Sequence, residues 1–371
     1  MTDKISKPII QKYSSGDEFV IDPFCGSGNV LKTAMLLGRN GVGVDINPLA
    51  VLISKVSTRK YDIDMLRQTL NNIIENIRPE EPPRSFIIEN GINYWFTFSA
   101  LSGIYSIKNS IDRCADKQVN DFFKVALSSI VRKVSKADPS IPPPVYSKKM
   151  RESKIRYGFD DVVKKFIATA NLNLRKAEVL SNRFSERNYT DIYRQNSIDF
   201  LRQSKRKVDL VLTSPPYIAA QKYTRSTSLE LMTIIGLSRH DLSDIDRIDI
   251  GSENLLSKEF LEYPHNTDLI EVAKPEQGVL INRFMDKMDT FFTFVGKVLN
   301  ENGHIAMIIG NNTINGKVVP VSNAIMKLAS SHSLRVKESY EDEIKNYSFF
   351  TKRNKNAGMI KKEHIMIFSK E

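Results

Sequence analysis

Cysteine and long apolar runs are scarce in this sequence of 371 residues. Cys25 and Cys114 are the only two cysteines, which excludes a disulfide framework and favours a reducing cytoplasm. No segment approaches the roughly 20 apolar residues of a membrane helix, so we expect no membrane association. The first residues lack the apolar centre of a secretory signal peptide. The five histidines are scattered without the spacing of metal ligands, and we predict no metal site.

Negative charge is also in short supply. The chain has 54 Lys and Arg against 43 Asp and Glu, which gives a formal net charge of +11. A basic protein attracts polyanions, and nucleic acid is the commonest of them. Positive residues cluster in the segments 148–156, 202–207 and 351–356. Charge alone leaves two alternatives open, a nucleic-acid partner or an ordinary basic surface.

Strand and helix patterns alternate at the start of the chain. Residues 18–22 predict a strand that runs into a glycine turn, and residues 29–38 have apolar side chains at helical spacing. Residues 39–45 predict a second strand, and Pro48 lies in the first turn of the next helix. This alternation predicts an α/β fold with a doubly wound, mostly parallel sheet.

The alternation then stops for about 125 residues. Residues 61–188 have mostly helical patterns, with a proline-rich stretch in their middle, and strand patterns resume near residue 190. We therefore expect a helical subdomain inserted into the sheet domain, with chain boundaries at 1–60, 61–188 and 189–371.

The end of the chain predicts the remaining elements. A long helix begins near residue 281 and has Gly303 as its predicted end. Residues 304–311 predict the next strand and residues 323–332 a helix. The last two predicted strands are 333–341 and 363–370.

The glycine turn DPFCGSG lies between the first strand and the first helix. Gly26 and Gly28 let the backbone approach a ligand closely, outside the carboxyl ends of the strands. Asp45 follows Gly28 by 17 residues, close to the spacing at which an acid binds a ribose in nucleotide-binding folds. NAD and other adenosyl ligands both fit this pattern, although Leu31 replaces the third glycine of the NAD fingerprint. A P-loop is excluded because no Gly-Lys-Ser/Thr follows.

The motif TSPPY, residues 213–217, ends an apolar strand with two prolines that cannot continue it. Together, DPFCGSG and TSPPY resemble the S-adenosylmethionine-dependent DNA amino-methyltransferases, which methylate cytosine N4 or adenine N6. The resemblance covers about 13–60 and 190–371. It implies a seven-stranded class I methyltransferase sheet with the helical segment as an insertion.

The chemistry of amino methylation explains the residue types in this motif. The amine of a base is a poor nucleophile, and it needs hydrogen-bond acceptors that favour a tetrahedral nitrogen. The resemblance implies that Ser214 and the carbonyl of Pro215 are these acceptors, with Pro216 stiffening the turn. Tyr217 would stack on a target base that has left the duplex.

The resemblance also implies a cofactor site for S-adenosylmethionine. Its amino-acid part would lie over the segment Asp22, Pro23, Phe24, Gly26 and Gly28, and Asp45 would bind the ribose hydroxyls. Asn196 would accept a hydrogen bond from the adenine amine, with Asp199 as the rival residue.

We therefore predict a site-specific DNA methyltransferase. Ser214, the residue before the two prolines, favours cytosine N4 over adenine N6 as its target. Double-stranded DNA is the expected partner, and an RNA amino-methyltransferase is the nearest alternative enzyme. The helical segment 61–188 is the main candidate for target recognition, with residues 218–277 as its competitor. Tyr223 and Arg225 either line the base pocket or pack in an amphipathic helix.

The segment before the glycine strand is short. Relatives use such a segment to hold the methionine end of the cofactor, and here only residues 1–18 are available, with 7–17 as a candidate remnant. A second chain or a homodimer that completes the site is therefore an alternative. A DNA-binding subunit that needs a partner for activity is the alternative from a different functional class.

Overall fold

The computed structural model describes residues 1–88, 91–218, 223–248, 250, 275–314, 317–343 and 362–370, with the backbone alone at 88, 223, 275–277, 312–314 and 317. The chain divides into two compact units. The first, the sheet unit, comprises Met1–Ser54, Ser185–Lys222 and Ile245–Glu371. The second, the helical unit, comprises Lys55–Phe184 and Tyr223–Asp244. Residues 223–244 thus belong to the helical unit, whereas the sequence boundaries assign them to the sheet domain.

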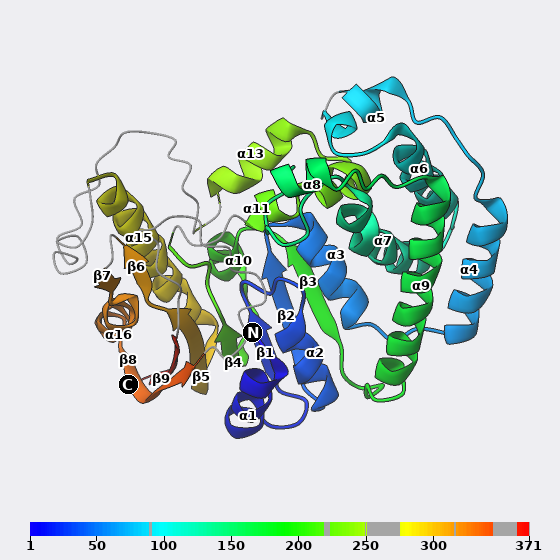
Figure 1. The fold of residues 1–371 in the computed structure, drawn as a ribbon. Helices are drawn as coiled ribbons and strands as arrows, with labels where there is room; N and C mark the ends of the chain where they lie inside the picture. Colours follow the sequence, from blue (N-terminus) through cyan, green and yellow to red (C-terminus); the bar gives the residue numbers. More distant parts are fainter. Residues whose placement is uncertain are drawn as a thin grey trace. The chain divides into compact units, whose positions relative to one another are not determined.

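Seven strands form the main sheet in the order β3-β2-β1-β4-β5-β9-β8 (Figure 1). Their bounds are β1 (Phe19–Asp22), β2 (Asn40–Asp45), β3 (Thr190–Arg194), β4 (Val208–Thr213), β5 (Leu299–Gly310), β8 (Leu334–Glu343) and β9 (Lys362–Lys370). Strands β1 to β5 are parallel, and β9 is antiparallel to both of its neighbours. This order confirms the predicted class I methyltransferase fold. Strands β6 (Asn312–Ile314) and β7 (Lys317–Val319) form a separate pair.

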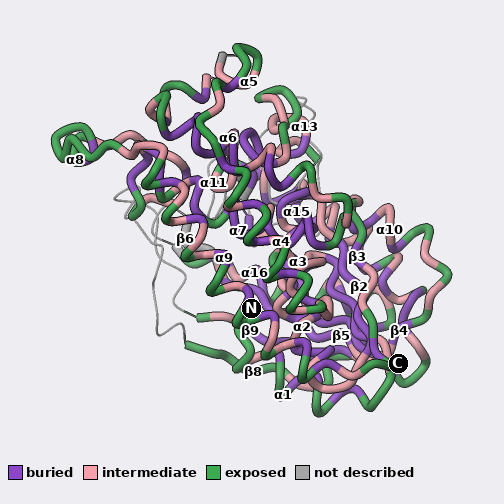
Figure 2. The backbone as a smooth tube through the Cα atoms, turned by 90° about the vertical axis from the view of Figure 1, so that its right-hand side faces the viewer, coloured by how far each residue is buried: buried purple, intermediate pink, exposed green. Residues whose placement is uncertain are grey.

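Helices cover both faces of the sheet. They are α1 (Asp3–Tyr13), α2 (Asn29–Leu36), α3 (Pro48–Ser57), α10 (Ser197–Gln203), α15 (Pro275–Val298) and α16 (Val321–Ser331). Because the pleat sends alternate side chains to opposite faces, Val20 and Leu210 pack with residues of α1 and α2. Their neighbours Ile21 and Val211 pack with residues of α10, α15 and α16. The central strands are therefore apolar at consecutive positions, and Figure 2 shows β2 and β5 as buried.

The described residues of the helical unit contain no strand. Its elements are α4 (Ile63–Asn76), α5 (Arg84–Ile88), η1 (Ile92–Tyr94), α6 (Phe98–Asp112), α7 (Lys117–Val131), η2 (Arg132–Val134), α8 (Lys148–Glu152), α9 (Phe159–Ser181), α11 (Tyr223–Ser226), α12 (Ser228–Glu230) and the π-helix η3 (Leu231–Ile235). Helix α13 (Arg239–Ile248) begins in this unit and ends in the sheet unit. The unit has its own core, centred on Phe123, Phe166 and Ile104. In the described part of the chain, no helix is long and apolar enough to cross a membrane.

The prediction that the long helix ends at Gly303 is wrong. Helix α15 ends at Val298, and β5 begins directly after it at Leu299. A side chain at Gly303 would place its Cβ 2.7 Å from the side chain of Leu299, which is fully buried and pairs with Val208. Gly303 is therefore needed because the Leu299 side chain lies close to its backbone inside the strand. A glycine required by such packing cannot be distinguished in the sequence from a glycine that ends a helix.

The glycines of the sheet unit give a direct test of its packing. We expect Gly43→Ala to lower the free energy of unfolding by about 1–3 kcal/mol, because the new Cβ would lie 2.5 Å from Leu31 Cδ1 and 3.1 Å from Cys25 Sγ. Gly296→Ala in α15 is the matched control, since nothing lies within 4 Å of its Cβ position. Helix propensity predicts that the control is neutral or slightly stabilising. Thermal denaturation measures both, and equal shifts in Tm would contradict this description of the packing.

Candidate functional site

The two sequence motifs meet at one edge of the sheet. Strands β1 and β4 are parallel neighbours, so Asp22 and Thr213, their last residues, lie at the same end. The Thr213 hydroxyl donates a hydrogen bond of 2.6 Å to Asp22 Oδ1. The turn that follows β1 and the turn that follows β4 are thereby joined through two side chains.

Asp22 is a buried carboxylate, and among the described residues only one of its two oxygens receives hydrogen bonds. It is 4% exposed, and the backbone N–H of Phe24 donates a second hydrogen bond to the same oxygen, Oδ1, at 3.1 Å. No group among the described residues donates to Oδ2. Burial raises the pKa of Asp22 to about 6, against the lowering effect of its two hydrogen bonds. A cation beside Oδ2 would stabilise the charged form.

The glycine turn has a left-handed backbone at both of its glycines. Gly26 has φ 51° and Gly28 has φ 77°, a region that residues with a Cβ rarely adopt. A Cβ at Gly28 would lie 2.5 Å from Ser54 Oγ, whereas nothing lies within 4 Å of a Cβ at Gly26. Gly28 is thus required by packing, and Gly26 leaves open space beside the turn.

Asp45 holds the glycine turn in place. Its Oδ2 accepts a hydrogen bond from the Gly26 N–H at 2.9 Å, and its Oδ1 accepts one from the Asn47 N–H at 2.8 Å. The carboxylate therefore fixes the loop at the end of β2. Each oxygen has a further lone pair, so the predicted contact with a ribose stays a prediction compatible with this geometry.

Asn196 has a structural role that the sequence analysis did not anticipate. It is the N-cap of α10, and its Oδ1 accepts hydrogen bonds from the N–H groups of Ile198 at 2.9 Å and Asp199 at 3.4 Å. The predicted contact with an adenine amine would use this same oxygen. Asp199, the rival residue, is half-buried and lies 3.6 Å from Arg202. Both assignments stay predictions.

Among the described residues, the serine of the TSPPY motif has no hydrogen-bond partner. Ser214 is half-buried, and its hydroxyl makes no hydrogen bond with any residue in the described part of the chain. Pro215 is buried and Pro216 is half-buried. A hydroxyl without a partner at the ligand edge is free to accept a hydrogen bond from a substrate amine.

Tyr217 is held in place by a residue from the far end of the chain. Only 8% of it is exposed, and its hydroxyl donates a hydrogen bond of 2.8 Å to Glu363 Oε1 in β9. Stacking on a base needs an accessible ring face, so the stacking role of Tyr217 stays a prediction. Sequence reasoning missed Glu363, because nothing in the sequence indicates that β9 lies beside β5.

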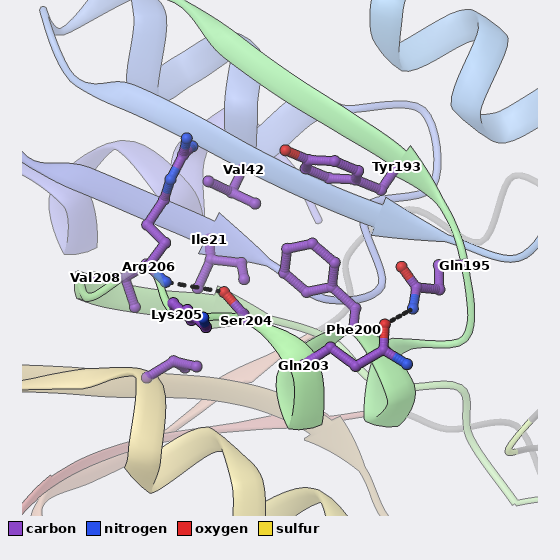
Figure 3. A pocket seen from close by; sticks show the side chains of 11 residues that line it. Ile21, Val42, Tyr193, Gln195, Phe200, Gln203, Ser204, Lys205, Arg206 and Val208 are labelled. Carbon is purple, nitrogen blue, oxygen red and sulfur yellow. Dashed lines mark hydrogen bonds between the residues drawn. The ribbon is translucent and has the colours of Figure 1, made fainter.

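A cavity of about 260 Å³ lies on the α10 side of the sheet, between α10 and strands β1, β2 and β3 (Figure 3). The rings of Tyr193 and Phe200 lie 4.9 Å apart in its wall, and Gln195 Nε2 donates to Gln203 Oε1 at 3.2 Å. None of the predicted catalytic or cofactor-binding residues lines this cavity. It is therefore separate from the edge at which the two motifs meet.

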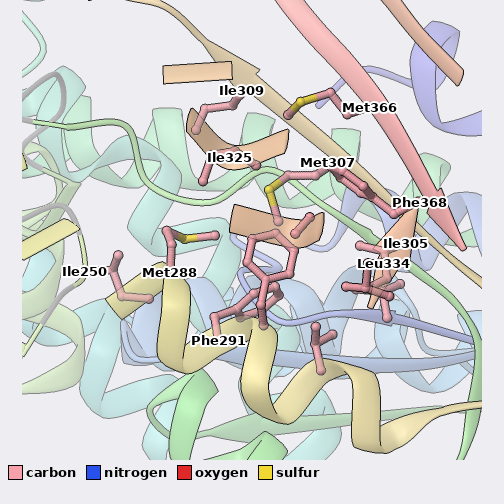
Figure 4. Close-up of a cluster of buried hydrophobic side chains, with 14 of the residues drawn as sticks. Ile250, Met288, Phe291, Ile305, Met307, Ile309, Ile325, Leu334, Met366 and Phe368 are labelled. Carbon is pink, nitrogen blue, oxygen red and sulfur yellow. The ribbon is translucent and has the colours of Figure 1, made fainter. Parts of the chain in front are cut away.

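Pro23 and Phe24, which the resemblance assigns to the cofactor, pack toward the core. Pro23 is buried, and the ring of Phe24 lies 5.8 Å from that of Phe291 in α15. Phe291 belongs to the apolar cluster that α15 forms with Ile305 and Met307 of β5 (Figure 4). Their contacts show a packing role, and a contact with the cofactor stays a prediction for both.

The N-terminal segment lies beside the glycine turn. The Met1 carbonyl accepts a hydrogen bond from Asn29 Nδ2 at 3.5 Å, and the Thr33 hydroxyl donates one to Asp3 Oδ1 at 3.2 Å. The charge of the N-terminal amine also acts to lower the pKa of Asp22. Residues 1–3 are thus in position to border the same site.

The weaker candidates lie in the helical unit. Tyr223 begins α11, and the structure describes only its backbone. Arg225 in the same helix is exposed. Of the competing recognition segment 218–277, residues 219–222, 249 and 251–274 also lie outside the described residues. The roles of these residues stay predictions.

Comparison with known proteins points to one family. The family model described as DNA methylase matches residues 3–56, which include the glycine turn and Asp45. Type II methyltransferase M.MvaI from Kocuria varians is 23% identical, over 92% of this chain and 79% of that protein. Type II methyltransferase M.BsoBI from Geobacillus stearothermophilus is 22% identical, over 80% of this chain and 64% of that protein.

Among solved structures, the rRNA methyltransferase aviRa from Streptomyces viridochromogenes is 11% identical. It is aligned over 99% of this chain and 85% of its own, with a TM-score of 0.36. A score this low carries no argument about substrate, and the fold assignment rests on the strand order.

The raised pKa of Asp22 makes stability depend on pH. The folded protein keeps this proton up to about pH 6, whereas the unfolded chain loses it near 3.8. The stabilising effect of the protonated form is therefore full below about pH 4 and is lost as pH rises through 6, by about 3 kcal/mol. Because Asp22→Asn cannot ionise, we expect the wild type to lose stability relative to this variant over that interval. Chemical denaturation across the pH range measures the difference, with Asp160→Asn, at an exposed position of α9, as the control. Parallel curves for the wild type and Asp22→Asn would refute the shift.

The hydrogen bond between Tyr217 and Glu363 is testable by a double-mutant cycle. We expect Tyr217→Phe and Glu363→Ala each to destabilise the protein, and the double variant to lose less than their sum by about 1–2 kcal/mol, because one bond is removed in all three. Glu363→Gln keeps an acceptor and should have a smaller effect than Glu363→Ala. Unfolding free energies give the coupling, and strictly additive losses would show that the bond is absent in solution.

Proposed function

We propose that this chain, which is related to the amino-methyltransferases of the N4/N6 DNA methylase family, uses S-adenosylmethionine to methylate the exocyclic amine of a base in double-stranded DNA. The observation that carries this proposal is the meeting of Asp22 and Ser214 at one edge of the sheet. Thr213 links them, since it bonds to Asp22 and directly precedes Ser214. A cofactor held by the first turn and an amine held by the second would then lie side by side.

The residues at this edge fit the cofactor. Asp22 Oδ2 has no donor among the described residues, so it can accept from the ammonium group of the cofactor. The open space beside Gly26 can take its amino-acid part, and Asp45 at the end of β2 can accept from the ribose hydroxyls. When bound, the cofactor supplies a methyl group on a positively charged sulfur.

We assign amine activation to Ser214 and Pro215. The Ser214 hydroxyl and the Pro215 carbonyl would each accept a hydrogen bond from the amine, so that its nitrogen becomes tetrahedral and its lone pair points at the methyl group. The two prolines contribute no backbone N–H that would compete for these acceptors, and they hold the turn rigid. The base must leave the duplex to reach this position.

Cytosine N4 is the amine that we propose, with adenine N6 as the alternative. The basis is the serine that begins the SPPY motif, because aspartate is typical of adenine enzymes in the family that the chain resembles. The acceptors at Ser214 and Pro215 suit either amine. The identity of the methylated nucleoside distinguishes the two.

We expect Ser214→Ala to bind S-adenosylmethionine as tightly as the wild type but to transfer methyl groups to duplex DNA roughly a hundredfold more slowly. The matched control is Ser330→Ala, an exposed serine of α16, which should leave both quantities unchanged. Calorimetric titration measures cofactor binding, and incorporation of labelled methyl groups measures transfer. Undiminished transfer by Ser214→Ala would remove this hydroxyl from the mechanism. If the wild-type chain neither binds the cofactor nor transfers methyl groups, the alternative of a DNA-binding subunit gains support.

A further inference from the structure

The helical unit concentrates its positive charge in one segment. Residues 132–156 contain eight Lys or Arg and two Asp or Glu. Residues 55–131 contain ten Lys or Arg and nine Asp or Glu. Apart from Lys133 in η2, the exposed cations of this segment lie on α8 and directly after it, and Figure 2 shows α8 as exposed. Two tyrosines border them. The basic–aromatic surface, as we name it, comprises Tyr94, Tyr146, Lys148, Lys149, Arg151, Lys154 and Arg156.

Hydrogen bonds around the buried Asp138 shape the loop that leads into this surface. Asp138 accepts hydrogen bonds from the hydroxyls of Ser140 and Ser147, both at 2.6 Å, which with the Ser140 N–H lower its pKa to about 2. The guanidinium of Arg132 donates to the carbonyls of Ile141 and Pro142. The Asp138 N–H donates to the Val145 carbonyl at 2.8 Å and closes the loop. The surface is therefore built on a preorganised loop, and a low pKa keeps Asp138 charged at physiological pH.

Aromatic rings and guanidinium groups are interleaved on this surface. Tyr94 is 52% exposed, and its ring lies 5.9 Å from that of Tyr146. Arg156 donates a hydrogen bond of 3.0 Å to the Tyr146 hydroxyl, and the Arg151 guanidinium lies 5.6 Å from the centre of the same ring. The rings hold the two guanidinium groups in place, so less conformational entropy is lost when they bind a ligand.

The cations of the surface have little negative charge to balance them. Lys148 has a carboxylate at 3.7 Å, in Glu152, but no Asp or Glu among the described residues lies within ion-pair distance of Lys149, Arg151, Lys154 or Arg156. Like charges gathered in this way repel one another. A polyanion would remove that repulsion and release its own counterions on binding.

We propose that the basic–aromatic surface binds the phosphate backbone of double-stranded DNA. This rests on the proposed function for the choice of DNA as the polyanion, and it adds the residues that supply affinity. Lys149, Arg151 and Lys154 contact phosphates, and Tyr94 and Tyr146 contact the sugar–phosphate chain beside them. The surface holds the duplex, whereas Ser214 and Pro215 act on the amine.

Neutralising the surface should weaken DNA binding in a salt-dependent way. For Lys149→Gln/Arg151→Gln/Lys154→Gln, we expect roughly ten- to a hundredfold weaker binding of a fluorescent DNA duplex at physiological salt. The slope of log affinity against log salt should fall by about two to three, since each phosphate contact contributes about 0.9. Fluorescence anisotropy without cofactor measures both, and circular dichroism checks that the variant is folded.

The matched control removes the same charge elsewhere. Lys4→Gln/Lys7→Gln/Lys176→Gln changes three exposed lysines of α1 and α9 and should shift affinity by less than about threefold. Lys149→Arg/Arg151→Lys/Lys154→Arg keeps the charge and should restore most of the binding. Equal weakening by the neutral variant and the control would overturn the proposal, because binding would then follow net charge alone. Tighter binding of an RNA duplex than of DNA would overturn the choice of DNA.

Methyl-transfer kinetics separate this proposal from the proposed function. If the surface binds DNA, the neutral variant raises the KM for DNA more than it lowers kcat. If the wild-type chain binds DNA through this surface but transfers no methyl group, the proposed function is refuted and the proposed DNA-binding surface is supported. If the neutral variant has an unchanged KM for DNA, the proposed DNA-binding role of the surface is refuted and the proposed function is unaffected.

Discussion

The hydrogen bond between Thr213 and Asp22 is the constraint on which the candidate site depends. It joins the last residues of two neighbouring parallel strands, and each residue opens a turn that carries one of the two motifs. Asp22 is buried there at a cost, visible in its raised pKa, that two hydrogen bonds only partly offset. A buried carboxylate with one oxygen that no described group donates to is poorly explained by stability alone.

The elements around this bond keep both turns in position. Asp45 accepts the Gly26 N–H, Ser54 packs against Gly28, and Glu363 accepts the Tyr217 hydroxyl. Each of these residues comes from a different strand or helix, so the geometry of the edge depends on β2, α3 and the antiparallel strand β9 together. The helical unit has its own core and contributes none of these contacts among the described residues. In our proposals, the helical unit binds DNA by charge and the sheet edge performs the methyl transfer.

Local patterns in the sequence were enough to predict the alternating strands and helices at the start of the chain and the glycine and proline turns of the two motifs. The seven-stranded sheet was predicted from the family resemblance. Contacts between distant segments could not be predicted in this way. Glu363 reaches Tyr217 because β9 inserts between β5 and β8, and no local pattern encodes that pairing. Gly303 appeared to be a helix stop because the close approach to Leu299 is a tertiary requirement. Asn196 is the N-cap of α10. The sequence alone cannot distinguish this capping role from the predicted contact with adenine.

The central claim is that the sheet edge directs a methyl group onto an exocyclic amine of DNA. The most direct measurement is mass spectrometry of nucleosides from the DNA of cells that express the chain, compared with cells that express Ser214→Ala. The account predicts N4-methylcytosine in the first sample and its loss in the second. If N6-methyladenine is found instead, with the same dependence on Ser214, the proposed site is supported and the target base is adenine. A sample with neither modified nucleoside, from cells that contain the folded chain and S-adenosylmethionine, would contradict the account.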